Sequence, residues 1–187
     1  MVCRGHRIFL GVHNQEEFKG RHLLQNDNTE VLGISEAVQS SDIVLLATPA
    51  MAAIEVTKSL GDTTGKIIID AMNIVRGNGP KGYTTTTLAV LDNTATQDVV
   101  KCFNTTGFNN MENTQYGETA IDAFMAGDSL LGKDVARHLA KDAGFAECYD
   151  VGGNSNFQLM EKFAFFWINL AMMQGQGREI GFKLLKR

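Results

Sequence analysis

The sequence predicts an α/β protein with a doubly wound, mainly parallel sheet, and the main reason is a regular alternation of two kinds of segment. Short runs of branched and apolar residues, which favour strands, recur along the chain and are mostly separated by helix-length segments. Such alternation is typical of βαβ units, whose strands lie parallel. The strand-like runs span residues 6–12, 43–48, 66–70, 99–103, 123–126 and 146–151.

Helix signals lie between several of these runs. The stretch SEAVQSSD predicts a short capped helix that starts at Ser35, and MAAIEVTKSLGD predicts one that ends at Gly61. Segment 132–144 places apolar residues on one face and has Gly144 as its stop signal. These helices supply the covering layers that a parallel sheet needs.

The pattern changes after residue 152, and the C-terminal segment reads as helical. Apolar residues recur at steps of three and four from Ser155 to Met173, which predicts a long helix. Because apolar side chains occupy so much of its circumference, more than one neighbour must bury it. Packing against the core is one explanation, and an interface with a second copy is the other. We therefore divide the chain into an α/β domain, residues 1–152, and a C-terminal helical segment, residues 153–187.

Charge and composition argue against several classes of function. The chain carries 17 Lys and Arg against 21 Asp and Glu, so nothing indicates a basic surface for nucleic acid or an anionic membrane. The longest apolar stretch, residues 163–173, is shorter than the roughly 20 residues that a transmembrane helix needs. The start of the chain has no signal-peptide pattern. Cys3, Cys102 and Cys148 are widely spaced and show no metal-ligand spacing with histidine, which predicts reduced thiols in a cytoplasmic protein.

One glycine pattern resembles a phosphate-binding loop but has the wrong context. Gly77, Gly79 and Gly82 have the G-x-G-x-x-G spacing, which needs a strand directly before it and a helix directly after it. The preceding strand-like run ends near Asp70, and Gly82 is followed by Tyr83 and four threonines, a poor first helical turn. We expect an exposed loop without a phosphate, in which alanine at Gly79 and Gly82 changes dinucleotide affinity less than Asn73→Leu does.

The carboxyl ends of the predicted strands carry small, hydroxyl and amide residues. They are GVHN (11–14), ATPA (47–50), DAMN (70–73) and FNTTGF (103–108). In open α/β sheets, ligands bind beyond these ends, and such residues suit a flat ring with a carboxamide or a ribose. The edges contain no nucleophile with a base and no pair of carboxylates, so no catalytic residue and no metal site is predicted. Each polar residue could instead close a turn. Together they favour hydride transfer by a bound cofactor.

Seven motifs, in order, resemble one family over almost the entire chain. GHRIFLGV, DIVLLATPA, IIIDAMN, VVKCFNTTGFNNM, FMAGD, DVGG and REIGFKLL resemble the NADP oxidoreductases that include the NADPH:coenzyme F-420 (deazaflavin) reductases. The cytosolic domains of the STEAP metalloreductases are similar. The resemblance implies a Rossmann-like NAD(P)-binding domain with a helical tail, commonly a homodimer through that tail. The implied activity is hydride transfer between NADP(H) and a flavin or deazaflavin (coenzyme F-420).

The resemblance also implies roles for individual residues. Thr48, Pro49 and Ala50 would line the path from adenosine to pyrophosphate, and Asn73 with Val75 the nicotinamide side. The small-molecule acceptor would be bordered by Asn104, Thr105, Thr106 and Gly107. Relatives that use NADP place a Ser-Arg pair on the 2′-phosphate, where this chain has Val12, His13 and Asn14. With neither that arginine nor an acid for a ribose diol, the preference leans only slightly to NADP over NAD.

In the family, the glycine loop lies directly upstream of a Gly-His pair like Gly5-His6, so we expect this sheet to lack its first strand. A slot in the core would result. We further expect the 187 residues to bind NADPH weakly or not at all, and a form extended by a strand and a glycine loop to bind and oxidise it. Two alternatives stay open: a dinucleotide-binding or sensing protein without turnover, and an inactive truncated remnant.

Overall fold

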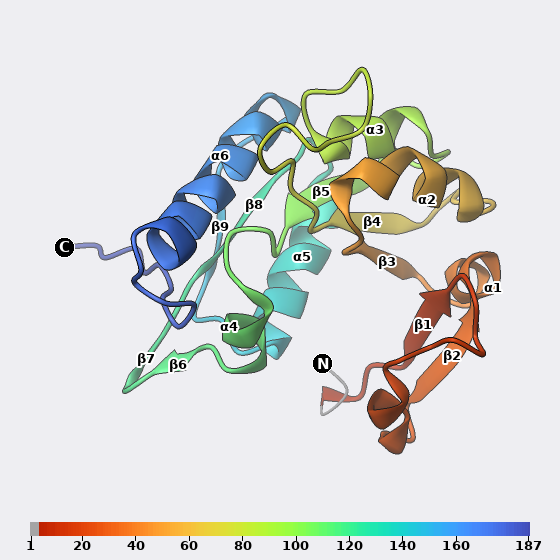
Figure 1. Ribbon diagram of the computed structural model, residues 1–187, viewed down its shortest axis with the longest axis horizontal. Helices are drawn as coiled ribbons and strands as arrows, with labels where there is room; N and C mark the ends of the chain where they lie inside the picture. The colour runs from red at the N-terminus through yellow and green to blue at the C-terminus, as the bar shows by residue number, and fades with distance from the viewer. Residues whose placement is uncertain (1–3) are drawn as a thin grey trace.

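The computed structural model describes residues 4–187 and shows an α/β structure built on a central five-stranded sheet (Figure 1). The strands lie side by side in the order β3, β4, β5, β8, β9. β3 to β5 run parallel, β8 is antiparallel to β5, and β9 is parallel to β8. The predicted mainly parallel sheet is confirmed. The strands are β3 (Ile43–Leu46), β4 (Ile67–Asp70), β5 (Val99–Cys102), β8 (Ala123–Ala126) and β9 (Cys148–Asp150).

Both faces of the sheet are buried, which makes the fold doubly wound. Consecutive residues of a strand point to opposite faces, and Ile68 and Ile69 are both fully buried, as are the neighbours Val99 and Val100. Ile68 and Val99 belong to an apolar cluster with residues of α1 (Ile34–Gln39), α2 (Ala53–Ser59) and α3 (Thr86–Asp92). Ile69 and Val100 belong to a second cluster, with α5 (Leu130–Asp142). Near-continuous apolar strands are what this arrangement requires.

The first strand-like run does not join this sheet, so the expectation of one sheet for all six runs is wrong. β1 (Ile8–Val12) pairs in parallel with β2 (Thr29–Gly33), a strand that the sequence pattern did not reveal. The pair lies at the opposite end of the molecule from α6 (Phe157–Ile168) (Figure 1). A cavity of about 150 Å³ separates β1 from β3, lined by Phe9 and Gly11 on one side and residues 43–46 on the other. This cavity is the space that lies between the two sheets at β1 and β3.

A hydrogen bond ties the segment before β1 to α5: His6 Nε2 lies 2.7 Å from Asp142 Oδ2. This bond lowers the pKa of Asp142 below its ordinary value of 3.8. A carboxyl group with a lowered folded pKa stabilises the folded state above its unfolded pKa, and the contribution disappears as the pH falls through the folded pKa. We expect Asp142→Asn to melt at a lower temperature than the wild type at neutral pH, and by a smaller margin at a pH below the ordinary value of 3.8. Thermal melts at both pH values measure this, and identical melting at neutral pH would contradict it.

The predicted helices are present, with small shifts at their ends. α1 begins at Ile34, one residue before the predicted Ser35. The helix expected at the ATPA strand end starts as a 3-10 turn, η3 (Ala50–Ala52), and continues as α2. α5 begins earlier than predicted because the side chain of Ser129 accepts a hydrogen bond from the backbone N–H of Gly132. The remaining short elements are η2 (Arg21–Gln25), α4 (Phe108–Glu112), β6 (Gln115–Tyr116) and β7 (Thr119–Ala120).

The four threonines after Gly82 start a helix, which corrects the expectation drawn from their propensity. Thr85 caps α3, because its hydroxyl accepts a hydrogen bond from the backbone N–H of Leu88 at 3.2 Å. Thr86 and Thr87 each donate a hydroxyl hydrogen bond of 2.6 Å to Asp70. Tertiary contacts with a buried carboxylate therefore outweigh the weak helix propensity of threonine.

The C-terminal segment is helical over the stretch predicted from Ser155 to Met173, but residues 174–187 form no helix, so the division into a helical segment of residues 153–187 was too long. A 3-10 turn, η4 (Asn154–Asn156), leads into α6, which continues as a π-helical turn, η5 (Asn169–Met173). Phe157 and Met160 of α6 pack against Ala126 of β8. The segment is thus part of the folded core, while several of its apolar side chains stay exposed.

The cysteines of the described residues are free thiols, as predicted. Cys102 and Cys148 are buried, with their sulfur atoms 3.8 Å apart. Burial raises the pKa of the Cys102 thiol well above its usual range. The prediction for Cys3 lies outside residues 4–187. Within those residues, we find no helix with the length and apolar character needed to cross a membrane.

Candidate functional site

Three parallel neighbours, β3, β4 and β5, bring their carboxyl ends to one edge of the sheet. The segments that follow them contain Pro49 and Ala50, Asn73, and Asn104. Each segment leaves its strand without continuing the ladder, so side chains and backbone at this edge are available to a ligand. Three of the four strand ends predicted from sequence to hold the cofactor therefore lie at this edge, while the fourth, residues 11–14, lies at the end of β1, outside this sheet.

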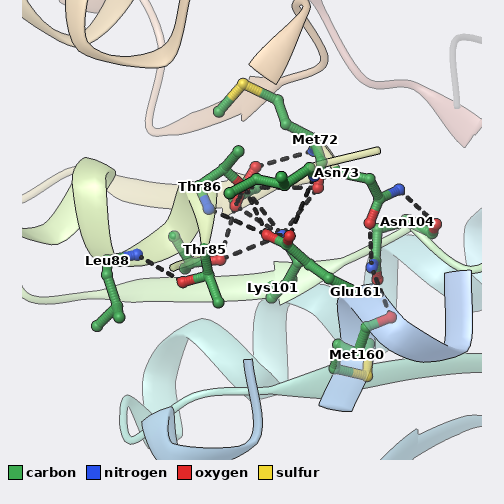
Figure 2. Close-up of polar contacts among 12 residues, drawn as sticks. Met72, Asn73, Thr85, Thr86, Leu88, Lys101, Asn104, Met160 and Glu161 are labelled. Carbon is green, nitrogen blue, oxygen red and sulfur yellow. Dashed lines mark hydrogen bonds and ion pairs between the residues drawn. The ribbon is translucent and has the colours of Figure 1, made fainter. Parts of the chain in front are cut away.

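Asn73 and Asn104 form a mutual pair at the centre of this edge. Asn73 Nδ2 donates to the backbone oxygen of Asn104 at 2.8 Å, and Asn104 Nδ2 donates to Asn73 Oδ1 at 2.9 Å. Asn104 Nδ2 also donates to the backbone oxygen of Met160 on α6 (Figure 2). The buried Oδ1 of Asn104 accepts no hydrogen bond from any residue that the structure describes. A buried acceptor without a donor is costly, and a bound ligand is one way to satisfy it.

A first cavity, which we name the Met172 cavity, lies on the α2 side of Asn73 and has a volume of about 520 Å³. It collects four of the predicted cofactor residues and adds apolar side chains from the C-terminal helix. The cationic residue in its lining is Arg76, which is exposed. The backbone of Arg76 is in the left-handed region, with φ 54°. The lining residues are Pro49, Ala50, Met51, Asn73, Val75, Arg76, Asn78, Ile168, Met172 and Met173.

A second cavity, the Phe108 cavity, lies on the other side and has a volume of about 460 Å³. Asn73 lines this cavity too, so it is a residue that the two cavities share. The lining also includes two of the predicted acceptor residues, Asn104 and Thr106. Aromatic and apolar residues make up most of the remainder: Leu45, Ala47, Ala71, Phe103, Phe108, Met111, Ala143 and Phe145, with Glu112 and Asp142.

The chain turns into the Phe108 cavity through an uncommon backbone conformation. Phe103, directly after β5, has φ 59°, a left-handed value that costs a bulky residue about 1–2 kcal/mol. Its buried ring packs near that of Phe145, with centroids 6.0 Å apart. Packing of this side chain offsets the cost of the turn, and the turn brings Asn104 to the edge. Strained backbone of this kind is often found at functional sites.

Behind the edge lies a buried ion cluster, which we define as Asp70, Lys101 and Glu161. Lys101 is fully buried, and its Nζ lies 3.0 Å from Asp70 Oδ2 and 3.1 Å from Glu161 Oε1. Nζ also donates to the hydroxyls of Thr86 and Thr87 and to the backbone oxygen of Met72. Figure 2 shows these contacts converging between β5, the start of α3 and α6. The cluster joins three elements that are distant in sequence.

Sequence reasoning missed this cluster, because Glu161 joins Asp70 from a segment 91 positions further along the chain, as the numbering shows. We expected no carboxylate pair at the strand ends, and for Asp70 the sequence left open a role at the ligand edge or in closing a turn. One signal was available: Lys101 interrupts the apolar run VVKCF, and a charged residue in a buried strand requires a partner. That signal predicts a partner but does not say where in the sequence it lies.

The other predicted site residues lie at different distances from the two cavities. Thr48 lies next to the edge and donates to Met72 Sδ at 3.3 Å, while Thr105 and Gly107 are buried. A Cβ at Gly107 would lie 2.8 Å from Trp167 Cη2, so Gly107 permits close packing of α6. His13 is exposed, as is Asn14, whose Oδ1 accepts a hydrogen bond from the backbone N–H of Glu16 in a tight turn. Neither lines the two cavities.

The glycine pattern at residues 77–82 lies in the loop between β4 and α3. Gly77 and Gly82 have positive φ angles, and the first helical residue after them is Thr86. The geometry of a phosphate loop, with glycines directly at a helix N-terminus, is therefore absent from this segment.

The comparisons with known proteins agree with this fold. A family model described as NADP oxidoreductase coenzyme F420-dependent matches residues 1–74. No curated protein sequence matches the chain. A solved structure of a candidate F420-dependent NADP reductase from Arthrobacter sp. FB24 is similar, with a TM-score of 0.84 at 19% identity over 98% of this chain and 90% of that one.

Two further structures are similar to this chain. A hypothetical protein from Sinorhizobium meliloti has a TM-score of 0.68 at 19% identity, over 96% of this chain and 83% of its own. An imine reductase from Streptomyces aurantiacus has a TM-score of 0.67 at 12% identity, over 92% of this chain and 57% of its own. At these identities the likeness establishes the Rossmann-like fold. The family whose model matches residues 1–74 is also the one that the sequence motifs resemble.

Proposed function

We propose that the protein transfers hydride between NADP(H) and a flavin or deazaflavin acceptor, with the two reacting rings on either side of Asn73. The observation that carries this proposal is that Asn73 lines both the Met172 cavity and the Phe108 cavity. A hydride donor and its acceptor must meet at near contact, so two spaces that share one small side chain suit this reaction. The description of the family model, which names both NADP and coenzyme F420, supports the same pairing.

The residues of the two cavities fit these ligands in chemical character. The Met172 cavity is mostly apolar, which suits a nicotinamide ring, and Arg76 supplies a cation for an anionic part of the ligand. The Phe108 cavity offers aromatic side chains for a flat ring and, at Asn104 Oδ1, a buried acceptor for a ring N–H or an amide. When bound, the dinucleotide would supply the hydride. The protein would bind and orient both rings and exclude water between them.

The test is turnover of NADPH with coenzyme F420, and separately with a free flavin, as acceptor. We would assay the 187-residue chain and a form extended upstream by a strand and a glycine loop. Acceptor reduction coupled to NADPH oxidation at equal stoichiometry is the expected result for the extended form, with much slower turnover by the 187-residue chain. NADH in place of NADPH reports the cofactor preference. Tight NADPH binding with no acceptor reduced by either form would favour the non-catalytic dinucleotide-sensing alternative instead.

We also propose that a second copy covers the exposed apolar side chains of the C-terminal helix. Leu159, Phe166 and Met172 are 55%, 51% and 62% exposed, which is unusual for large apolar residues so near one another in sequence. The expected result is a homodimer in sedimentation equilibrium, converted to monomer by Phe166→Lys. A monomeric wild type at micromolar concentration would contradict this interface.

A further inference from the structure

The backbone segment that carries Asn73 is held by charged side chains rather than by secondary structure. Residues 71–74 follow β4 and belong to no helix or strand. Met72 N–H donates to Asp70 Oδ1 at 2.8 Å, and the Met72 oxygen accepts from Lys101 Nζ at 2.8 Å. The residue preceding Asn73 is therefore fixed on both its peptide groups by the buried ion cluster.

The residue that follows Asn73 is held by the third member of the cluster. Ile74 N–H donates to Glu161 Oε2 at 3.0 Å, while Glu161 Oε1 accepts from Thr86 N–H at 3.0 Å and from the Thr86 hydroxyl at 3.2 Å. Glu161 is 6% exposed, and its position on α6 is fixed by neighbours that pack against β8. One carboxylate thus links the C-terminal helix to the site loop and to the start of α3.

We infer that Glu161 is a positioning residue, which holds Asn73 between the two cavities by fixing the backbone of Ile74. The inference rests on the proposed function, because Asn73, the residue that Glu161 would position, is the one that we propose lies between the two ring sites. Hydrogen bonds to a charged acceptor are stronger than those between neutral groups, so a carboxylate restrains the segment better than an amide of the same size. Small displacements of a positioned group lower a rate by large factors, whereas they change binding less.

The test is Glu161→Gln, with Glu55→Gln on the exposed face of α2 as the matched control. Glutamine keeps one carbonyl oxygen but places an NH₂ group where the second acceptor stood, so Ile74 or Thr86 loses its partner. We expect faster hydrogen exchange at the amides of Ile74 and Thr86. We also expect kcat to fall by about tenfold, with the KM for NADPH nearly unchanged. The control, Glu55→Gln, should leave both the amide exchange rates and kcat at their wild-type values.

Two results would overturn the inference. One is a Glu161→Gln protein that melts at a lower temperature but keeps wild-type kcat well below that temperature, because Glu161 would then act on stability alone. The other is unchanged amide exchange at Ile74 and Thr86. Since the exchange measurement needs no cofactor, it decides the inference even if the wild type reduces no acceptor, a result that would instead count against the proposed function.

Discussion

Replacing Lys101 by methionine is expected to lower the free energy of unfolding by about 3–5 kcal/mol, the largest loss of stability that the structure predicts. Methionine fills a similar volume but removes the only ammonium group in contact with Asp70 and Glu161 within the described residues. The two carboxylates would then lie in a buried site with no countercharge. The backbone oxygen of Met72 would lose its Lys101 donor as well.

Urea denaturation of the wild type, Lys101→Met and a triple variant measures this effect. The triple variant adds Asp70→Asn and Glu161→Gln, which remove the uncompensated charges while keeping similar shapes. We expect it to regain a large part of the lost stability, because most of the cost is the burial of unpaired charge rather than the loss of attraction. A triple variant less stable than Lys101→Met would show that the cluster acts through its hydrogen bonds instead.

Asn73→Leu is expected to lower the rate of acceptor reduction by about 100-fold, the largest effect on activity. Leucine removes both hydrogen bonds with Asn104 and leaves Asn104 Nδ2 with the backbone oxygen of Met160 as its acceptor. Its branched side chain would also fill space at the boundary of the two cavities, where the reacting rings are proposed to meet. Turnover with NADPH and coenzyme F420 measures this, with thermal melting to confirm that the variant is folded.

The matched control is Lys81→Ala, an exposed change in the loop that carries the glycine pattern. Alanine at Gly79 is a less clean control than the sequence suggested, since a Cβ there would lie 2.5 Å from Cδ1 of Ile74, next to Asn73. Lys81→Ala should keep wild-type turnover. Equal losses of turnover in Lys81→Ala and Asn73→Leu would mean that the loop binds the cofactor and that Asn73 contributes no more to turnover than the loop does.

The central sheet and the edge of the site could be predicted because they depend on local patterns. Apolar runs such as residues 67–69 predict buried strands, and the parallel order of β3, β4 and β5 then brings Asn73 and Asn104 together. β2 was missed because TEVLG is mixed in polarity, and its pairing with β1 exists only in the folded chain. Strand pairing is a tertiary property that propensity does not contain.

The ion cluster and the start of α3 could not be predicted for a related reason. Threonine at positions 85–87 disfavours a helix locally, and only the buried Asp70 carboxylate explains why the helix begins there. Asp70, in turn, is buried because Lys101 accompanies it. The burial of each of these residues is unfavourable alone and becomes favourable only with partners from other segments. Sequence patterns within one segment therefore cannot predict the cluster.

The proposed hydride transfer is tested most directly by following the hydride itself. NADPH deuterated at the reactive carbon of its nicotinamide ring would be incubated with the protein and coenzyme F420, and the reduced acceptor examined by mass spectrometry. If the rings meet across Asn73, the deuterium appears in the reduced acceptor in proportion to the NADPH consumed, and Asn73→Leu slows this transfer. Reduced acceptor without the deuterium, or transfer that is as fast in Asn73→Leu as in the wild type, would contradict the account.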